Sequence, residues 1–240
     1  MQYQSRVPVE RDRRQRYRLP NALAPEWSNE MAYIVGLTAT DGCLFTGLRK
    51  INFKSGDREL VETYLRVLGR ANPVKTKRTR IGRWVHFTEF GDARLYRWLL
   101  TIGLMPAKSL VLGAIDAPDD VLAPLFRGLL EGDGSILNFV HHPTVKAAPD
   151  YEHERLSVVF NSASRAHIEW IRSRAGSLFS VTGSIYQRRP VEGRHDFFRL
   201  AYGKHDSITL LSAMYPSSDV PKLERKWRIW QDYARRHGLN

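Results

Sequence analysis

The feature that most constrains the fold of this chain is a short pattern that occurs twice. Residues 34–42 read IVGLTATDG and residues 126–134 read FRGLLEGDG, and the two aspartates lie 92 positions apart (133 − 41). In each copy an apolar, helix-like run leads into an aspartate and a glycine, and residues that favour a strand follow at once. Such a repeat predicts a duplicated structural unit.

The segments that follow the two copies have the same expected order of helices and strands. In the first half we expect a helix over 30–40, strands around 43–47 and 49–54, a helix over 57–69 that stops at Gly69, strands around 74–80 and 83–90, and a helix over 92–102. In the second half we expect a helix over 119–132, strands around 135–140 and 155–161, a helix over 164–179, strands around 183–189 and 196–202, a helix over 206–214 and a final helix over 222–236. The order α-β-β-α-β-β-α thus occurs twice.

The two halves also match residue by residue. INFKSGDREL at 51–60 aligns with VVFNSASRAHI at 158–168. In this alignment Lys54 corresponds to Asn161, which lies 107 positions later in the chain (161 − 54). The 15 extra residues (107 − 92) belong to the polar stretch VHHPTVKAAPDYEHE in the first hairpin of the second half. We therefore expect a first repeat at 27–115 and a second at 116–240. Residues 1–26 are arginine-rich and are expected to form a basic arm, either flexible or bound in a DNA groove, with a mitochondrial transit peptide as the alternative.

Composition narrows the class of partner and the compartment. The chain has 240 residues with 37 Lys and Arg against 25 Asp and Glu, a net charge of +12, which attracts polyanions such as nucleic acid. No apolar run approaches the roughly 20 residues that a membrane span needs, and no signal-peptide pattern is present. The single cysteine, Cys43, excludes a disulfide framework and is expected to be a small buried residue. We expect a cytoplasmic protein, or one of an organelle's matrix or stroma, that is not secreted.

Small residues and carboxylates have separate expected roles in the two copies. Helices that carry Gly36, Ala39, Gly128 and Gly132 can approach closely, and Gly42 and Gly134 are expected to take positive φ at the helix ends. A helix C-terminus already carries partial negative charge, so an aspartate there is unfavourable unless a cation lies beside it. Two such ends side by side would suit Mg²⁺, which next to a phosphodiester can activate water and stabilise developing charge.

The two motif copies resemble the motif that names the LAGLIDADG homing endonucleases, and the resemblance covers about residues 27–237. It implies an α+β fold: a duplicated α-β-β-α-β-β-α unit with pseudo-twofold symmetry, whose two antiparallel four-stranded sheets form a DNA-binding saddle. It further implies a monomeric endonuclease that uses two or three Mg²⁺ ions. Such an enzyme hydrolyses both strands of a long, pseudo-palindromic double-stranded DNA target across the minor groove and leaves 3′ overhangs.

The resemblance also implies roles for particular residues. Asp41 and Asp133 match the metal-binding carboxylates, and the carbonyls of the preceding Thr40 and Gly132 would help to ligate. Basic or polar residues near the metals are matched by Lys54 and Asn161, and more weakly by Lys108 and Lys226, which could contact phosphate or stabilise charge. Where the family often has an acidic residue, the first copy has Ala39 and the second has Glu131. Because Lys54 and Asn161 are also unequal, we expect the two cuts to differ in rate.

Alternation along the expected strands indicates which side chains could face DNA, because every second residue of a half-buried strand points to the open side. Lys75 and Lys77 share one side of their strand, and Arg78 and Arg80 share the other. Tryptophans such as Trp84 are expected to be in the core. Arginine suits guanine, asparagine and glutamine suit adenine, and other polar groups hold phosphates. The candidate DNA-binding residues are Arg49, Asn52, Lys75, Lys77, Arg78, Arg80, Arg83, Ser135, Asn138, Tyr186, Gln187, Arg188, Arg189 and Arg199.

Three other functions use the same sequence features. An RNA maturase would bind its own intron RNA and assist splicing, and a regulator would bind DNA without cutting it. The presence of both aspartates favours cleavage, and no stretch remains for a helix-turn-helix domain. An intein nuclease is disfavoured because no splicing domain flanks the repeats and the chain begins with Met1.

Overall fold

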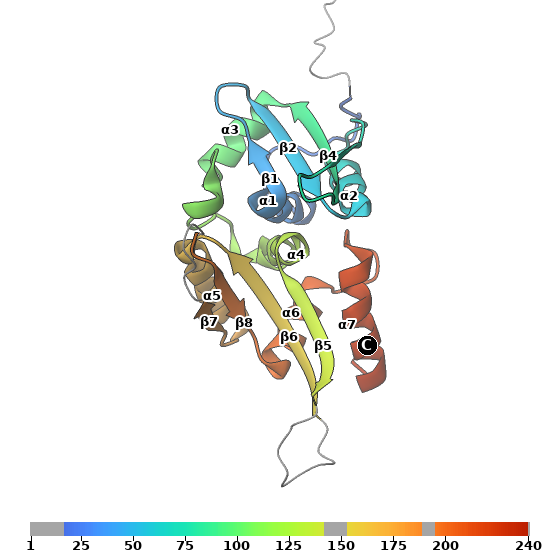
Figure 1. Cartoon of the computed structure of the whole chain (residues 1–240), viewed down its shortest axis with the longest axis vertical. Coiled ribbons are helices and arrows are strands. Elements are labelled where there is room, and N and C mark those ends of the chain that lie inside the picture. The colour runs from blue at the N-terminus through green and yellow to red at the C-terminus, as the bar shows by residue number, and fades with distance from the viewer. Residues whose placement is uncertain (1–16, 142–152, 189–194, 240) are drawn as a thin grey trace, which may run out of the picture.

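The computed structural model describes residues 17–141, 153–188 and 195–239, and it contains the expected duplication (Figure 1). The first half comprises α1 (Asn29–Asp41), β1 (Gly42–Leu44), β2 (Lys50–Ser55), α2 (Arg58–Leu68), β3 (Lys75–Arg78), β4 (Trp84–Gly91) and α3 (Ala93–Thr101). Two 3₁₀ turns, η2 (Lys108–Leu110) and η3 (Asp119–Val121), lead to the second half. That half comprises α4 (Leu122–Gly132), β5 (Ser135–His141), β6 (His153–Ser162), α5 (Arg165–Phe179), β7 (Ser184–Gln187), β8 (Phe198–Ala201), α6 (Lys204–Met214) and α7 (Glu224–His237).

Each half contributes one antiparallel sheet of four strands, and the two strand orders correspond. The first sheet has the order β1-β2-β4-β3 and the second the order β5-β6-β8-β7. Burial alternates along β2, where Ile51 and Phe53 are fully buried while Asn52 is partly open and Lys54 is exposed. One face of each sheet therefore packs on helices and the other is left open.

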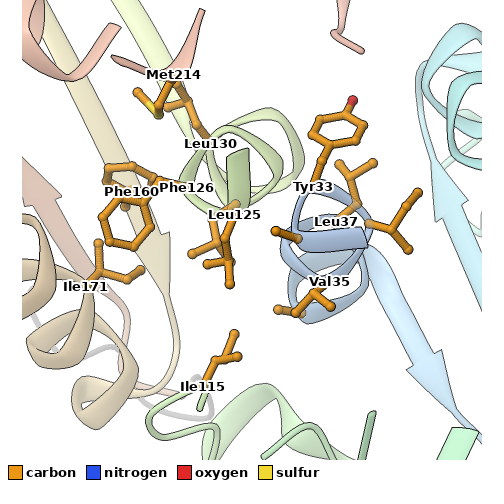
Figure 2. Packing of buried hydrophobic residues seen from close by; sticks show 14 of the residues in the cluster. Tyr33, Val35, Leu37, Ile115, Leu125, Phe126, Leu130, Phe160, Ile171 and Met214 are labelled. Atoms are coloured by element: carbon orange, nitrogen blue, oxygen red, sulfur yellow. The ribbon is translucent and has the colours of Figure 1, made fainter. Parts of the chain in front are cut away.

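The core of the molecule is centred on α1 and α4, which pack against each other between the two sheets (Figure 1). The Ser28 hydroxyl caps α1 by accepting a hydrogen bond from the Met31 amide at 3.1 Å. Helix α1 is apolar all round and buried from Met31 to Ala39, as expected for a central helix. In Figure 2, Tyr33 and Leu37 of α1 lie beside α4, whose Phe126 extends the core towards Phe160 and Ile171 of the second half.

Two glycines permit the close approach of these helices. A Cβ atom added at Gly36 would lie 2.3 Å from the carbonyl oxygen of Leu125, and one added at Gly128 would lie 2.3 Å from that of Tyr33. Each glycine therefore faces the backbone of the other helix, which confirms the predicted close packing. The relation is reciprocal, as a pseudo-twofold axis between the helices requires.

The expectation that Gly42 and Gly134 have positive φ is wrong. Gly42 is extended, with φ −84° and ψ 153°, and Gly134 is not among the glycines with positive φ in the described part of the chain. Both positions need glycine for space: a Cβ at Gly42 would lie 2.5 Å from the Thr38 carbonyl oxygen, and one at Gly134 would lie 2.7 Å from that of Val159. Gly69 does end α2 in the left-handed region, as expected.

The C-terminal part of the expected basic arm is docked on the end of α2. The Leu19 amide donates to the carbonyl of Gly69 at 2.9 Å, and the Ala71 amide donates to that of Tyr17 at 2.9 Å. A flexible arm is therefore wrong for residues 17–23, because backbone hydrogen bonds fix them to the first half. Contact of these residues with DNA stays a prediction, and residues 1–16 lie outside the described residues.

Two side chains expected in the core are at the surface. Cys43 is exposed because it lies on the open face of β1. Trp84 is 56% exposed at the start of β4, where it projects beyond the helices that cover the rest of that sheet face. Within the described residues, no helix is both long and apolar enough to span a membrane.

Candidate active site

Asp41 and Asp133 occupy equivalent positions at the C-terminal ends of the two central helices. Asp41 is the last residue of α1, and Asp133 directly follows α4. Burial and then the negative charge of Asp133 raise the pKa of Asp41, nearby lysines lower it, and the net result is a pKa of about 7. Loss of hydration also raises the pKa of Asp133. The protein therefore brings two carboxylates close enough to repel each other at the ends of two helix dipoles, as predicted.

The residues before the aspartates, Thr40 and Gly132, meet where the two helix ends cross. A Cβ at Gly132 would lie 1.9 Å from the Thr40 hydroxyl oxygen, so only glycine fits there. Thr40 and Asp133 line a cavity of about 220 Å³ together with Asn161. The two residues whose carbonyls are expected to bind metal, Thr40 and Gly132, are therefore in contact with each other, and each directly precedes one of the two aspartates.

Lys54 and Asn161 take up different positions in their halves, although they are equivalent in sequence. Lys54 is exposed on the open face of β2, and its charge lowers the pKa of both Asp41 and Asp133. The Asn161 side-chain amide instead donates to the Asp133 carbonyl at 2.8 Å. At this pair of equivalent positions the first half thus has an exposed cation, and the second half has a neutral amide that holds the backbone of its aspartate.

Lys108 and Lys226 are both buried and are bound to backbone carbonyls at the ends of the motif helices. Lys108 Nζ donates to the Gly42 carbonyl. Lys226 Nζ donates to the equivalent carbonyl of Gly134 at 2.7 Å and to those of Leu130, Glu131 and Gly132 at 2.8, 2.8 and 3.3 Å. An ammonium has three N–H groups, so at least one of them is shared. Burial lowers the pKa of Lys226 to about 8 and also lowers that of Lys108.

These two lysines neutralise the helix ends on which the aspartates sit. The last carbonyls of a helix lack partners within the helix, and a cation is favourable there. The sequence suggested contacts with phosphate, but the Lys226 ammonium is occupied by carbonyls, one of them the Gly132 carbonyl expected to bind metal. The geometry therefore favours a positioning role for Lys226, whereas Lys108 donates a single hydrogen bond within the described residues, to the Gly42 carbonyl, and its contact with phosphate stays a prediction.

Glu131 is fully buried in a polar cluster that joins the two halves. Its carboxylate accepts hydrogen bonds from the hydroxyls of Tyr33 at 2.6 Å and Tyr215 at 2.9 Å. Arg127 lies with its guanidinium 5.1 Å from the Tyr33 ring centroid and donates to the Met214 carbonyl at 2.6 Å. Burial raises the pKa of Glu131, and Arg127 and the tyrosine hydroxyls lower it. Ala39 has no such side chain, so the halves differ here as well.

Sequence reasoning missed this cluster, because Tyr33, Arg127 and Tyr215 are far apart in the chain. One signal was present: Arg127 lies in the middle of an otherwise apolar motif helix, where a charged residue needs a buried partner.

Most candidate DNA-binding residues of the first half are exposed, but they do not share one face. Lys75 and Lys77 lie on the open face, since Lys75 is opposite Phe87, which is in turn opposite Lys54. Asn52 is on the same face and donates to the Thr88 carbonyl at 3.1 Å. The remaining candidates of this half lie elsewhere: Arg78 is on the other face over the ring of Trp84, and Arg49, Arg80 and Arg83 are in the turns that join strands.

The candidates of the second half are also divided between faces. Tyr186 lies opposite Arg199 and Arg199 opposite Asn161, so these side chains share the open face, as does Ser135. The expectation that Asn138 faces DNA is wrong, because it has the opposite parity and binds Glu154 at 2.8 Å and Arg236 at 2.9 Å beside α7. The others are near the end of β7: Gln187 bonds Asp196 at 3.1 Å, Arg188 lies over the Phe197 ring, and Arg189 lies outside the described residues.

The potential metal ligands are few. Within the described ranges, no group of three or more Asp, Glu, His or Cys side chains converges as a ready-made metal site. The protein can offer the two carboxylates and the carbonyl oxygens beside them. This all-oxygen set fits a hard divalent cation such as Mg²⁺, which keeps several waters and binds through one or two carboxylates together with phosphate. Loss of hydration raises the pKa of both aspartates, and the neighbouring lysines offset only part of this rise.

Comparison with solved structures identifies the fold. No family model matches the sequence, and no curated protein matches it. A mesophilic variant of the homing endonuclease I-DmoI superposes with a TM-score of 0.54 over 85% of this chain and 97% of its own, at 12% identity. The meganuclease I-SmaMI, bound to uncleavable DNA, superposes with a TM-score of 0.55 over 85% and 88%, at 10% identity. Full-length DUF199/WhiA from Thermotoga maritima superposes with a TM-score of 0.51 over 89% and 69%, at 14% identity.

At these identities the likeness defines the fold alone. The chain has the single-chain, two-repeat LAGLIDADG fold with two four-stranded antiparallel sheets, as the motifs predicted. The resemblance to LAGLIDADG homing endonucleases is thus confirmed at the level of architecture. The roles of the individual site residues stay predictions.

Proposed function

We propose that this chain is a divalent-metal-dependent endonuclease that cuts both strands of a long, asymmetric, pseudo-palindromic DNA duplex. The observation that carries the proposal is the pair of aspartates at the ends of two packed helices, with Asp41 held at a raised pKa beside Asp133. Strongly shifted pKa values of this kind cluster at functional sites, and a bound cation would relieve the repulsion between the two carboxylates. The net charge of +12 and the two open sheet faces support a polyanionic partner, and homing endonucleases that share this fold have been crystallised with DNA.

In this proposal Asp41 and Asp133 hold divalent cations together with the carbonyls of Thr40 and Gly132 and the scissile phosphates. The bound metal would activate water and take up phosphoryl charge. I-DmoI has been crystallised with DNA and Ca²⁺, and a variant of it with target DNA in the presence of Mn²⁺, which supports a divalent ion and leaves Mg²⁺ as part of the proposal. Lys108 and Lys226 donate to carbonyls at the helix ends, whereas Lys54 faces the open side and is the best placed of these three lysines to contact a scissile phosphate.

The two halves should not cut equally well. Lys54 adds a positive charge on the side of Asp41, while Asn161 on the other side is neutral and already holds a backbone carbonyl. We therefore expect the strand served by the first half to be cut faster. Conversion of Asn161 to Lys should reduce the difference between the two rates.

The test is cleavage of a library of duplexes in Mg²⁺ by the wild type and by Asp41→Asn and Asp133→Asn. We expect each variant to lose double-strand cleavage by at least about 100-fold, because transition-state charge stabilisation is usually the largest catalytic contribution. Asp120→Asn is the matched control, since Asp120 is an exposed aspartate outside the site, and it should cut normally. Wild-type rates in both site variants would show that the metal assignment is wrong.

The alternative is a protein that binds nucleic acid without cutting it, either a maturase for its own intron RNA or a DNA-binding regulator. The fold is also that of DUF199/WhiA, so architecture alone does not select cleavage. A splicing assay with Asp133→Asn separates the maturase, because a protein that supports splicing should retain that activity without the carboxylate.

A further inference from the structure

The open faces of the two sheets are chemically different. The described strands of the first sheet present lysines on this face and no arginine. Those of the second sheet present arginines and aromatic residues and no lysine. If the chain had two equivalent DNA-reading halves, the same kinds of side chain would be expected on both faces.

Four lysines project from the open face of the first sheet: Lys50, Lys54, Lys75 and Lys77. Lys50 is paired with Glu89 at 3.1 Å, and Lys77 lies over the Phe87 ring with its Nζ 5.1 Å from the centroid. An ammonium is a compact point charge on a flexible stem, which attracts phosphate without a fixed geometry. This face therefore suits attraction to a DNA backbone more than discrimination between bases.

The centre of the second open face is the cross-strand pair of Tyr186 and Arg199. Tyr186 is 57% exposed, and neither its hydroxyl nor the Arg199 guanidinium makes a hydrogen bond to a described residue. Two hollows, of about 630 and 440 Å³, adjoin this pair, and Leu137 lines both with it. Phe139, 48% exposed, Arg155 and Lys204 of α6 also line the larger hollow, and Val159 lines the smaller.

These features correspond to the chemistry of base edges in the major groove. A guanidinium with free N–H groups can bind guanine O6 and N7 together, and an apolar hollow can accept the thymine methyl group. Aromatic and aliphatic side chains add contact area without a net charge, so they do not bind the backbone of every sequence equally. The second face can therefore distinguish sequences in a way that lysines cannot.

We propose that the two halves divide the recognition of DNA: the second sheet reads guanine- and thymine-containing sequence through Arg199, Tyr186 and their hollows, and the first sheet holds its half-site mainly by lysine–phosphate attraction. This division rests on the proposed function, because it assumes that both open faces contact one duplex. It predicts a target in which the half under the second sheet is strictly defined and the half under the first sheet is permissive.

The test measures binding of duplexes selected by the wild type from a randomised pool in Ca²⁺, at several salt concentrations. Arg199→Lys keeps the charge and loses the bidentate fork, so it should lower discrimination at one position of the target by roughly 5- to 150-fold. It should leave the salt dependence unchanged. The double variant Lys75→Gln with Lys77→Gln should weaken binding to all sequences alike. Its plot of log affinity against log salt should fall less steeply, with the magnitude of the slope reduced by about 2. Lys75→Arg with Lys77→Arg, which preserves both charges, is the control and should keep the slope.

The outcomes separate this division from the proposed function. If the wild type binds no duplex, the proposed function fails. The division alone is overturned if the wild type binds a defined target but Arg199→Lys weakens all sequences equally. It is also overturned if the double Lys→Gln variant changes base preference, or if both half-sites prove equally strict.

Discussion

The replacement Gly36→Ala tests whether helix packing positions the candidate site. The added Cβ would lie 2.3 Å from the Leu125 carbonyl oxygen and 2.8 Å from the Leu129 nitrogen, both backbone atoms that cannot rotate away. Ordinary contact begins at 3.4 Å, so α1 and α4 must separate locally by about 1 Å (3.4 − 2.3). Overpacking of this kind costs about 3 kcal/mol, and alanine returns up to about 1 kcal/mol of helix propensity, which leaves a net loss of about 2 kcal/mol.

The same displacement should impair function, because Asp41 and Asp133 sit at the ends of the two helices. A misplacement of about 1 Å in a catalytic constellation can lower the rate about 100-fold. Gly176→Ala is the matched control: Gly176 is also helical, but its added Cβ would be 3.4 Å from the nearest atom, the Val181 carbonyl oxygen. This control should be as stable as the wild type or up to about 1 kcal/mol more stable.

The assay combines urea unfolding with DNA cleavage under conditions where both variants are folded. We expect the unfolding midpoint of Gly36→Ala to fall by roughly 1 M, for a denaturant dependence of about 2–3 kcal/mol/M. Cleavage should fall further than stability alone explains. If Gly36→Ala is as stable as Gly176→Ala, or cuts at the wild-type rate, the helix crossing does not position the site and the reasoning is refuted.

Three further predictions concern buried polar groups, and each is checked by denaturant unfolding without divalent metal. The pKa of Asp41 is raised to about 7, so its ionised form destabilises the folded protein at higher pH. Asp41→Asn should therefore increase the free energy of unfolding at pH 8 by about 1–3 kcal/mol, and by less as the pH falls towards 4. A variant that is less stable than the wild type at pH 8 would contradict this. Tyr33→Phe leaves the buried Glu131 with one hydroxyl fewer and should lower stability by about 1–3 kcal/mol, whereas Tyr186→Phe, at an exposed hydroxyl, should change it by less than about 0.5 kcal/mol. Burial lowers the pKa of His167 to about 4, so as the pH falls this histidine is protonated in the unfolded chain before it is protonated in the folded protein. Between pH 7 and pH 4.5 the free energy of unfolding of the wild type should therefore fall by about 2 kcal/mol more than that of His167→Asn. Equal falls would rule out this contribution.

The architecture could be predicted because the signals for it are local and occur twice. The apolar helix of residues 30–40 and the amphipathic helix of 57–69 are found within one or two residues of their expected ends. The glycines were harder, because a sequence shows only that a side chain is missing. Gly69 supplies a left-handed residue and Gly42 supplies space, and this difference depends on what packs against each.

The site was predictable in its aspartates but not in its lysines. The position of Asp41 and Asp133 follows from the motif, whereas the direction of the Lys226 side chain depends on how α7 packs against the end of α4. Strand parity decides the DNA-facing set: Ser135 and Asn138 are three apart on one strand and must point to opposite faces. Only the register with β6 shows that Ser135 is the one on the open side.

The bond between Tyr33 and Glu131 has a consequence for any attempt to exchange halves between proteins of this fold. Glu131 belongs to the second repeat, but one of its two hydroxyl partners comes from the first. A second repeat transplanted next to a foreign first repeat without this tyrosine would carry an under-satisfied carboxylate at the joint. Recombinant proteins built from this chain should therefore treat Tyr33 as part of the C-terminal module, or replace Glu131 with an apolar residue at the same time.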